Sequence, residues 1–266
     1  MNTESFCPNG RLLNDIDSDF TISDKVAAKD ELSLIQSEVA REQIVFHADG
    51  RRSLLIILQG MDTSGKDGTI KKVFLNTSPM GLKIANFKKP NKIEMAHDYL
   101  WRVHQETPER GQIGIFNRSH YEDVLVTRVE DLISQDHFER RLEHINNFEK
   151  MLHDEGTEII KFYLHISPKV QKERIIERLQ NSEKHWKFDP DDINSRKKWT
   201  SYIKTYDHVI SKTDTEYAPW YVIPADHKWS RNLIVAKIVL SKLKSLGSKF
   251  PKADFEPSII KVPDIK

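Results

Sequence analysis

Apolar runs and apolar positions at helical spacing alternate along most of the chain. In residues 23–46, apolar side chains recur every three or four positions and leave a polar outer face, which predicts an amphipathic helix. Residues 53–59 contain a continuous apolar run and end before Gly60, and such a run is typical of a strand buried on both faces of a parallel sheet. The two patterns predict a helix followed by a central strand.

The same alternation continues toward the C-terminus. Further strands are expected at residues 82–87, 112–116, 158–166 and 221–224. Further helices are expected at residues 66–76, 93–105, 121–129, 135–155 and 230–246, and one more begins at Ser167 and Pro168, which suit a helix N-terminus. Strands that alternate with long helices predict an α/β fold, in which helices flank a mainly parallel sheet.

Three parts of the chain differ in pattern. Residues 1–50 combine an extended lead-in with the first helix, which we expect to pack on the core, and residues 51–246 hold the main α/β domain. Within that domain, residues 181–214 show no strand pattern and are rich in Lys, Trp and Asp, so they predict a helical lid over one end of the sheet. Pro and Lys dominate residues 247–266, which predict a tail that is disordered or packs on a neighbour.

Composition and charge exclude several classes of protein. The 266 residues include 41 Lys and Arg and 40 Asp and Glu, so the net charge of +1 indicates neither nucleic acid nor an anionic membrane as a partner. No apolar run approaches the roughly 20 residues that cross a bilayer. The N-terminus lacks the apolar segment of a secretory signal, and the single cysteine, Cys7, cannot form an internal disulfide. We therefore expect a cytoplasmic protein whose anion-binding site is local.

A glycine-rich segment directly follows the first predicted strand. Gly60-Met-Asp-Thr-Ser-Gly-Lys-Asp-Gly68 matches the pattern G-x-x-x-x-G-K between a strand and a helix, which predicts a phosphate-binding loop, or P-loop. The backbone N–H groups around Gly60, Gly65 and Gly68 would bind phosphate oxygens, and Lys66 would follow the transferred phosphoryl group. The alternative interpretation is a glycine turn that only joins a strand to a helix.

The same segment carries two carboxylates that bear on metal binding. Asp67 stands where P-loop enzymes usually have the Ser or Thr that holds Mg²⁺, so a metal must be held differently here. Asp62 lies inside the loop, where it would repel phosphate unless a cation neutralised it. We expect Asp62 and Asp67 to bind Mg²⁺, or alternatively Mn²⁺, together with phosphate oxygens. Asp67 is also explained by stabilisation of the helix N-terminus.

A second polar cluster follows the strand predicted at residues 112–116. Asn117 stands where such a strand often ends in Asp, Arg118 is placed to stabilise charge on phosphate, and Glu122 is placed to reach a metal or to orient an acceptor. The alternative for Arg118 and Glu122 is an ordinary ion pair, four residues apart, at a helix start.

Two groups of basic residues suggest contacts to a polyanion. One group lies on the helix after Ser167 and in the predicted lid, and comprises Arg174, Arg178, Lys184 and Lys187. The other lies in and after the second strand and could line a channel for a long polyanion, and comprises Lys83, Lys88 and Lys89. A solvated surface explains either group equally well.

Four segments together resemble the polyphosphate kinase type 2 family, and most of all its class III members. These are the segment from Gly60 to Gly68, Trp101-Arg-Val-His104, Phe116-Asn-Arg-Ser-His-Tyr-Glu-Asp123 and Ala218-Pro-Trp-Tyr-Val-Ile-Pro224. The resemblance implies a P-loop kinase-like parallel sheet with a helical lid, usually in a homodimer or homotetramer. It also implies Mg²⁺-dependent phosphoryl transfer between inorganic polyphosphate and the nucleotides AMP, ADP and ATP.

The resemblance leaves some points open. Some relatives carry Asp where Asn117 stands and Asn where Glu122 stands, and the glutamate of class III members is linked to the use of both AMP and ADP. Two other functions remain as alternatives from the residues alone: an ATP-dependent nucleotide kinase, or a non-enzymatic module that binds NTP. Asp67 in place of Ser or Thr argues against the first, and the carboxylates beside Lys66 and Arg118 argue against the second.

Overall fold

A five-stranded parallel sheet forms the centre of the protein. The structure, a computed structural model, describes residues 3–263. The strands are β1 (Ser53–Gln59), β2 (Leu82–Asn86), β3 (Ile113–Asn117), β4 (Thr157–His165) and β5 (Trp220–Pro224). Their order in the sheet is β2-β3-β1-β4-β5, and all four pairings are parallel. The α/β prediction is confirmed, and β1, in which every residue is buried, lies in the middle of the sheet.

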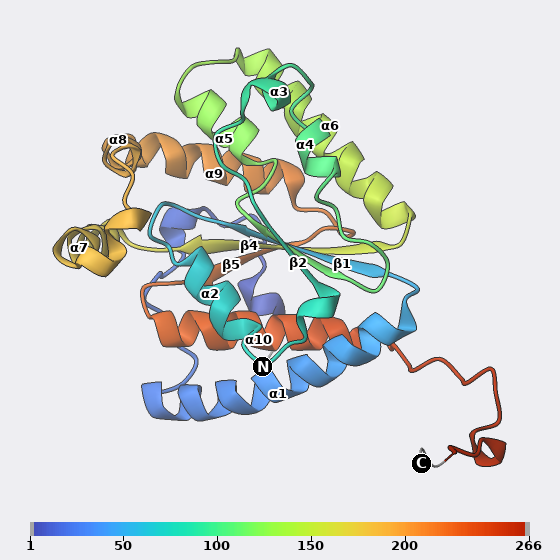
Figure 1. The fold of residues 1–266 in the computed structure, drawn as a ribbon. Coiled ribbons are helices and arrows are strands. Elements are labelled where there is room, and N and C mark those ends of the chain that lie inside the picture. Colours follow the sequence, from blue (N-terminus) through green and yellow to red (C-terminus); the bar gives the residue numbers. More distant parts are fainter. Residues whose placement is uncertain (1–2, 264–266) are drawn as a thin grey trace.

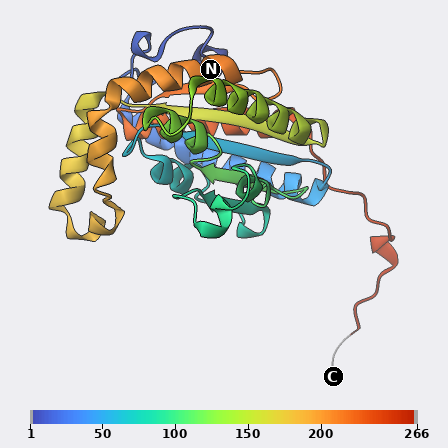
Figure 2. The same ribbon diagram turned by 90° about the horizontal axis from the view of Figure 1, so that it is seen from above.

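Helices cover both faces of this sheet (Figure 1). One face carries α1 (Lys25–Asp49), α2 (Lys66–Val73) and α10 (Lys228–Ser245), and the other carries α5 (Glu122–Val129), α6 (Gln135–Asp154) and α9 (Trp199–Thr213). The helices α3 (Lys92–Met95) and α4 (Trp101–His104) follow β2. The pair α7 (Pro168–Gln180) and α8 (Asp191–Lys197) projects from the body, as Figure 2 shows.

A capping carboxylate and a glycine mark the two ends of α1. The Asp24 carboxylate accepts hydrogen bonds from the N–H groups of Val26 and Ala27, which caps the N-terminus of α1. Gly50 adopts a left-handed φ of 61° and ends the helix. The apolar positions noted in the sequence face the core, and α1 packs along α10.

The prediction of a single helix at residues 93–105 is wrong. Two short helices, α3 and α4, stand there, because the Asp98 carboxylate accepts hydrogen bonds from the N–H groups of Leu100 and Trp101. Such a side-chain acceptor competes with the helical backbone and starts a new turn.

The segment expected to form a lid, residues 181–214, divides into two parts. It contains no strand, as predicted, but α9 packs against α5 and α6, and one face of α9, which includes Tyr202, Tyr206 and Val209, is buried. Only residues 181–197, with the 3-10 helix Ser182–Lys187 and α8, stand out beside α7 (Figure 2).

The N-terminal segment packs on the core, whereas the C-terminal segment extends away from it. The lead-in holds 3-10 helices at Thr3–Phe6 and Leu13–Asp15, and Phe6 and Leu13 are buried in the core. The C-terminal tail extends away from the body and exposes Phe250 and Phe255 (Figure 1). Residues 1–2 and 264–266, which belong to these two predicted segments, lie outside the described residues.

A buried ionic network joins the sheet to the helices α5, α6 and α9. Lys161 on β4 donates to Glu149 of α6 at 2.6 Å, to the Tyr121 hydroxyl at 3.0 Å and to the Thr213 carbonyl at 2.7 Å. His120 and Tyr121 also contact the Glu149 carboxylate, at 3.2 and 2.9 Å. The Lys161 ammonium holds the pKa of Glu149 below its usual value against the effect of burial.

We expect Glu149→Gln to lower the free energy of unfolding by about 3 kcal/mol, because it leaves the Lys161 ammonium buried without its counter-charge. Urea unfolding measures this loss. The matched control is Asp154→Asn, which removes the exposed partner of Lys150 on the same helix and should cost about 0.5 kcal/mol or less. Equal effects of the two substitutions would contradict a role of the buried pair in stability.

Candidate active site

The glycine loop lies at the carboxyl end of the central strand β1 and leads into α2. Gly60 and Gly65 have φ angles of 144° and 103°, in the region that glycine alone adopts easily. A Cβ atom at Gly60 would lie 2.7 Å from the Leu164 carbonyl oxygen, and one at Gly65 would lie 2.0 Å from Arg231 Nη1. The loop therefore needs glycine at both positions because the neighbouring atoms leave no room for a side chain.

Two buried arginines hold the carbonyl oxygens of this loop. Arg174 Nη1 donates to the carbonyls of Thr63 and Ser64 at 3.0 and 3.2 Å, and its Nη2 donates to the carbonyls of Ala225 and Asp226. Arg231 Nη1 donates to Ser64 at 2.9 Å, and burial together with the charge of Arg174 lowers the pKa of Arg231 to about 9.

One of these arginines, Arg174, was predicted as a site residue, and the other, Arg231, was not. Arg174 was expected to bind phosphate, but its guanidinium donates to backbone carbonyls beneath the loop. Sequence analysis missed Arg231, since an arginine among the polar residues at the start of a helix carries no signal of which loop it reaches. In the structure, both guanidinium groups hold the loop by its carbonyl oxygens.

The lysine of the loop folds back over it. Lys66 is buried, and its Nζ donates to the Gly60 carbonyl at 2.8 Å. Burial and then the nearby Arg118 guanidinium lower the pKa of Lys66, and the carboxylates of Asp62 and Glu122 oppose this shift. The position of Lys66 suits an ammonium that contacts a phosphate bound in the loop.

Arg118 stands beside the loop in a strained conformation. Its φ of 63° is left-handed, as is the φ of 64° at the β-branched Thr63, and such strain collects at functional sites. Arg118 Nη2 donates to Asp62 at 2.8 Å. Its ion pair is therefore with the loop carboxylate, and not with Glu122 as the alternative interpretation of the sequence required.

Glu122 is held next to this pair by a neighbour that sequence analysis did not single out. The Gln59 amide is oriented so that its nitrogen faces an acceptor and its oxygen faces donors. The nitrogen then donates to Glu122 at 3.0 Å, and the oxygen accepts from Ser119. Burial raises the pKa of Glu122, while the charges of Arg118 and Lys66 lower it. Gln59 thus fixes the orientation of Glu122 from the end of the central strand.

The lid contacts the loop helix through Asp67. Lys187 Nζ donates to one Asp67 oxygen at 2.9 Å, and Asn117 Nδ2 donates to the other at 2.8 Å and to Asn86 at 2.7 Å. Lys184 pairs with Glu177 on the outside of the lid. Lys187 is therefore the predicted lid lysine that the structure brings to the loop helix.

The lysines expected to line a channel beside β2 are mostly paired. Lys83 lies 3.3 Å from Glu106 and also donates to the Gln105 carbonyl, and Lys89 lies 2.5 Å from Asp191 in the lid. Lys88 contributes its carbonyl oxygen to Arg102. Two of the three predicted channel lysines, Lys83 and Lys89, are therefore held by carboxylates in the structure.

The three carboxylates expected to bind a metal do not form one cluster. Among residues 3–263, no three acidic, His or Cys side chains gather closely enough to hold an ion by themselves. Mg²⁺ is nevertheless commonly bound by one or two carboxylates together with substrate phosphates. Asp62, an oxygen ligand inside the phosphate loop, fits this kind of site, whereas Asp67 is occupied by Lys187 and Asn117.

These features together define a class of protein. A glycine loop at the end of the central parallel strand, a lysine folded over it, an arginine beside it and a helical lid are the parts of a P-loop phosphotransferase. Residues 22–251 match the family described as Polyphosphate kinase 2 (PPK2), and the chain belongs to this family.

Similar proteins agree with that assignment. The chain is 46% identical to the AMP/ADP-polyphosphate phosphotransferase of Meiothermus ruber, across 93% of this chain and 94% of the relative. It is 38% identical to the ADP-polyphosphate phosphotransferase of Rhodopseudomonas palustris, across 82% and 81%. The crystal structure of polyphosphate kinase 2 from Arthrobacter aurescens TC1 superposes with a TM-score of 0.93 at 38% identity and covers 96% of this chain and 93% of that one. Among the described residues, no helix has the length and apolar character of a membrane span.

Asp192 of α8 lies near the charges of Asp62, Arg118 and Arg178. It is buried, and it accepts a hydrogen bond from Arg178 of α7 at 3.1 Å, so Arg178, which was expected to bind phosphate, is paired with this carboxylate in the structure. Burial and the charge of Asp62 raise the pKa of Asp192 to about 6, and the guanidinium groups of Arg178 and Arg118 offset only part of this rise.

We expect Asp192→Asn to make the protein more stable to unfolding. This gain in stability should grow as the pH rises from about 4 to 6 and stay constant above 6. The pKa of Asp192 is 3.8 in the unfolded chain and about 6 in the folded protein, so its ionisation between these pH values destabilises the folded state. Asparagine does not ionise and avoids this loss. Thermal unfolding at a series of pH values measures the difference. Asp254→Asn, in the exposed tail, controls for the removal of one charge, and a difference that does not vary with pH would refute the expectation.

Proposed function

We propose that this protein transfers phosphoryl groups from inorganic polyphosphate to AMP and ADP. The observation that carries the proposal is the Arg118–Asp62 ion pair, which lies beside Lys66 at the phosphate loop of a chain in the polyphosphate kinase 2 family. The names of the relatives from Meiothermus ruber and Rhodopseudomonas palustris support polyphosphate as one substrate and AMP and ADP as the others.

The residues of the site act by position and charge. The loop N–H groups at the start of α2 hold the oxygens of a phosphate, and Lys66 and Arg118 stabilise the negative charge of the phosphoryl group as it moves in line from donor to acceptor. The lid excludes water, which would otherwise accept the phosphoryl group. No side chain is required as a nucleophile, so the transfer proceeds without a covalent enzyme intermediate.

A divalent cation completes the proposed site. Mg²⁺, for which Mn²⁺ can substitute, neutralises phosphate charge when it is bound. We assign Asp62 as its main protein ligand, and Glu122 as a second ligand or as the residue that orients the acceptor. Because Asp62 pairs with Arg118 in the structure, binding of the cation would release the guanidinium toward the phosphates.

Further points belong to the same proposal. Transfer to ADP yields ATP, so ATP is the product here and the phosphate donor in the reverse reaction. We also propose a cytoplasmic protein that assembles as a homodimer or homotetramer, as the resemblance to the family implies. The alternatives, an ATP-dependent nucleotide kinase and a non-enzymatic NTP-binding module, are disfavoured because Asp67 replaces the usual Ser or Thr and because the chain belongs to a kinase family.

The decisive assay mixes the protein with ADP, Mg²⁺ and long-chain polyphosphate without ATP and follows ATP formation. We expect robust turnover, and we expect Lys66→Ala to reduce it by more than tenfold, a loss above about 1.4 kcal/mol of transition-state stabilisation. Lys71→Ala, an exposed residue of the same helix, is the control and should retain activity. No ATP formation by the unsubstituted protein would refute the function, and activity in Lys66→Ala above a tenth would refute the role of the lysine.

We expect Glu122→Asn to depress the phosphorylation of AMP more than that of ADP. AMP is one phosphate shorter, and the carboxylate that Gln59 orients can hold a cation or a water where the missing phosphate would sit. The ratio of kcat/KM for the two acceptors is the measurement, with Glu130→Gln, an exposed residue just beyond the same helix, as the control. Equal losses on both acceptors would contradict this role.

A further inference from the structure

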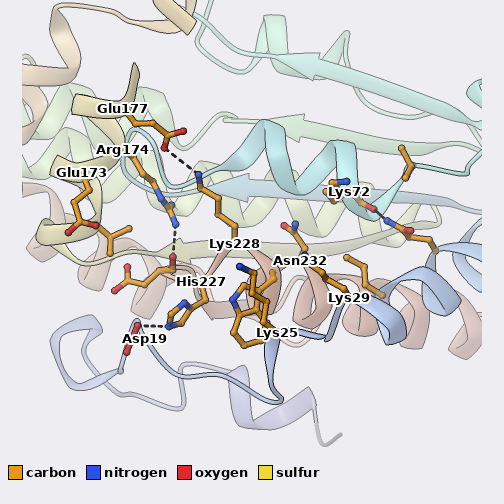
Figure 3. A pocket seen from close by; sticks show the side chains of 16 residues that line it. Asp19, Lys25, Lys29, Lys72, Glu173, Arg174, Glu177, His227, Lys228 and Asn232 are labelled. Carbon is orange, nitrogen blue, oxygen red and sulfur yellow. Dashed lines mark hydrogen bonds and ion pairs between the residues drawn. The ribbon is translucent and has the colours of Figure 1, made fainter. Parts of the chain in front are cut away.

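The open groove shown in Figure 3 carries charges of both signs. Glu177 pairs with Lys228, Asp19 pairs with His227, and Arg174 donates to the backbone carbonyl of Asp226. Charges that satisfy one another in this way indicate no particular ligand. A buried amide at the other side of the phosphate loop, in contrast, faces a residue of the candidate site.

This amide belongs to Gln59, a polar residue inside the central strand β1. The side chain of Gln59 is fully buried, and the residue directly precedes Gly60 of the phosphate loop. Apart from Ser53, at the opposite end, the other residues of β1 are apolar. Burial of an amide costs free energy unless hydrogen bonds replace those that it made to water. The partners of Gln59 therefore decide what this residue contributes.

The backbone of Ser119 fixes the orientation of the amide. The Ser119 N–H group can only donate, and it lies 3.1 Å from one end of the amide, so that end must be the oxygen. The Ser119 hydroxyl also donates to this oxygen, at 3.0 Å, and accepts from the Tyr121 N–H at 3.2 Å. The amide nitrogen therefore faces Glu122 Oε1 at 3.0 Å, and the Tyr206 hydroxyl lies 3.3 Å from the same end. A half-turn of the amide would set its nitrogen against an N–H group and its oxygen against a carboxylate.

The amide orients the Glu122 carboxylate without changing its charge. Glu122 is partly exposed, so a bound substrate can reach it, and it lies near the charges of Lys66 and Arg118. A cationic side chain in place of Gln59 would compete with these two residues for the carboxylate, whereas a neutral amide supplies only a directed hydrogen bond. Because the donor stands on the central strand, the sheet sets the direction of the carboxylate.

We propose that Gln59 is a positioning residue that determines how well the enzyme uses AMP as an acceptor. The inference rests on the proposed function, in which Glu122 holds a cation or a water in place of the phosphate that AMP lacks. A carboxylate without its donor turns away from this direction, and the shorter acceptor is then held out of line with the transferred phosphoryl group. ADP supplies the additional phosphate itself, so it depends less on the hydrogen bond from Gln59.

The first test compares kcat/KM for AMP and for ADP in Gln59→Met, a side chain of similar length without the amide. We expect the AMP-to-ADP ratio of kcat/KM to fall by about fivefold or more, and kcat/KM for ADP to change by less than about twofold. The control is Ser53→Ala, which removes a buried hydrogen bond to Thr157 at the other end of β1 and should leave the ratio unchanged. Equal losses on AMP and ADP in Gln59→Met would overturn the proposal.

A second variant, Gln59→Glu, guards against a general loss of structure. It keeps the oxygen that accepts from Ser119 and replaces only the donor that faces Glu122. We expect the AMP-to-ADP ratio to fall in this variant as well, and thermal unfolding checks that each variant is folded. A ratio equal to that of the unsubstituted protein would overturn the role of the amide nitrogen.

A double-mutant cycle shows whether Gln59 acts through Glu122. In a Glu122→Ala background, Gln59→Met should change the AMP-to-ADP ratio by less than about twofold, because the carboxylate that the amide orients is gone. An undiminished effect of Gln59→Met in that background would mean that Gln59 acts only by holding Ser119, and would overturn the inference while the proposed function stands. No ATP formation from ADP by the unsubstituted protein would refute the proposed function, and this role with it.

Discussion

The site depends on how two buried guanidinium groups hold one short loop. Arg174 and Arg231 donate to the carbonyl oxygens of Thr63 and Ser64, and their other hydrogen bonds go to backbone carbonyls and to the Asn232 amide oxygen. Burying two arginines side by side is costly, as the lowered pKa of Arg231 shows, and the loop carbonyls compensate that cost. The same close approach excludes any side chain at Gly65. The shape of the phosphate loop therefore depends on two arginines that bind its carbonyl oxygens.

The cationic side chains around the loop are paired with carboxylates. Arg118 pairs with Asp62, Lys187 with Asp67, and Arg178 with Asp192. The strained φ values at Thr63 and Arg118 fit a site whose geometry is maintained by its surroundings. By contrast, the Lys161–Glu149 pair has no exposure, and it anchors the segment that follows Arg118.

Several elements could be predicted because their signals are local. The buried run of β1, the cap at Ser167 and the glycine pattern around Lys66 each depend on neighbours in the sequence. The helix expected at residues 93–105 failed because one carboxylate, Asp98, interrupts a periodicity that otherwise looks continuous. The predicted lid included α9, whose inner face is buried in the structure, since the amphipathic pattern of α9 does not reveal whether its apolar face meets the core or a ligand.

The sequence by itself determined the fold class, the phosphate loop and the identity of the residues that flank it, because hydrophobic period, glycine spacing and motif order are properties of the chain. The tertiary structure alone decided which charges meet. It placed Arg174 beneath the loop and brought Arg231 to it from a helix, although Arg231 and Ser64 are 167 residues apart in the chain. The physical reason is that electrostatic and hydrogen-bond partners are chosen by distance in space, and residues far apart in the chain become neighbours only when the sheet and its helices pack.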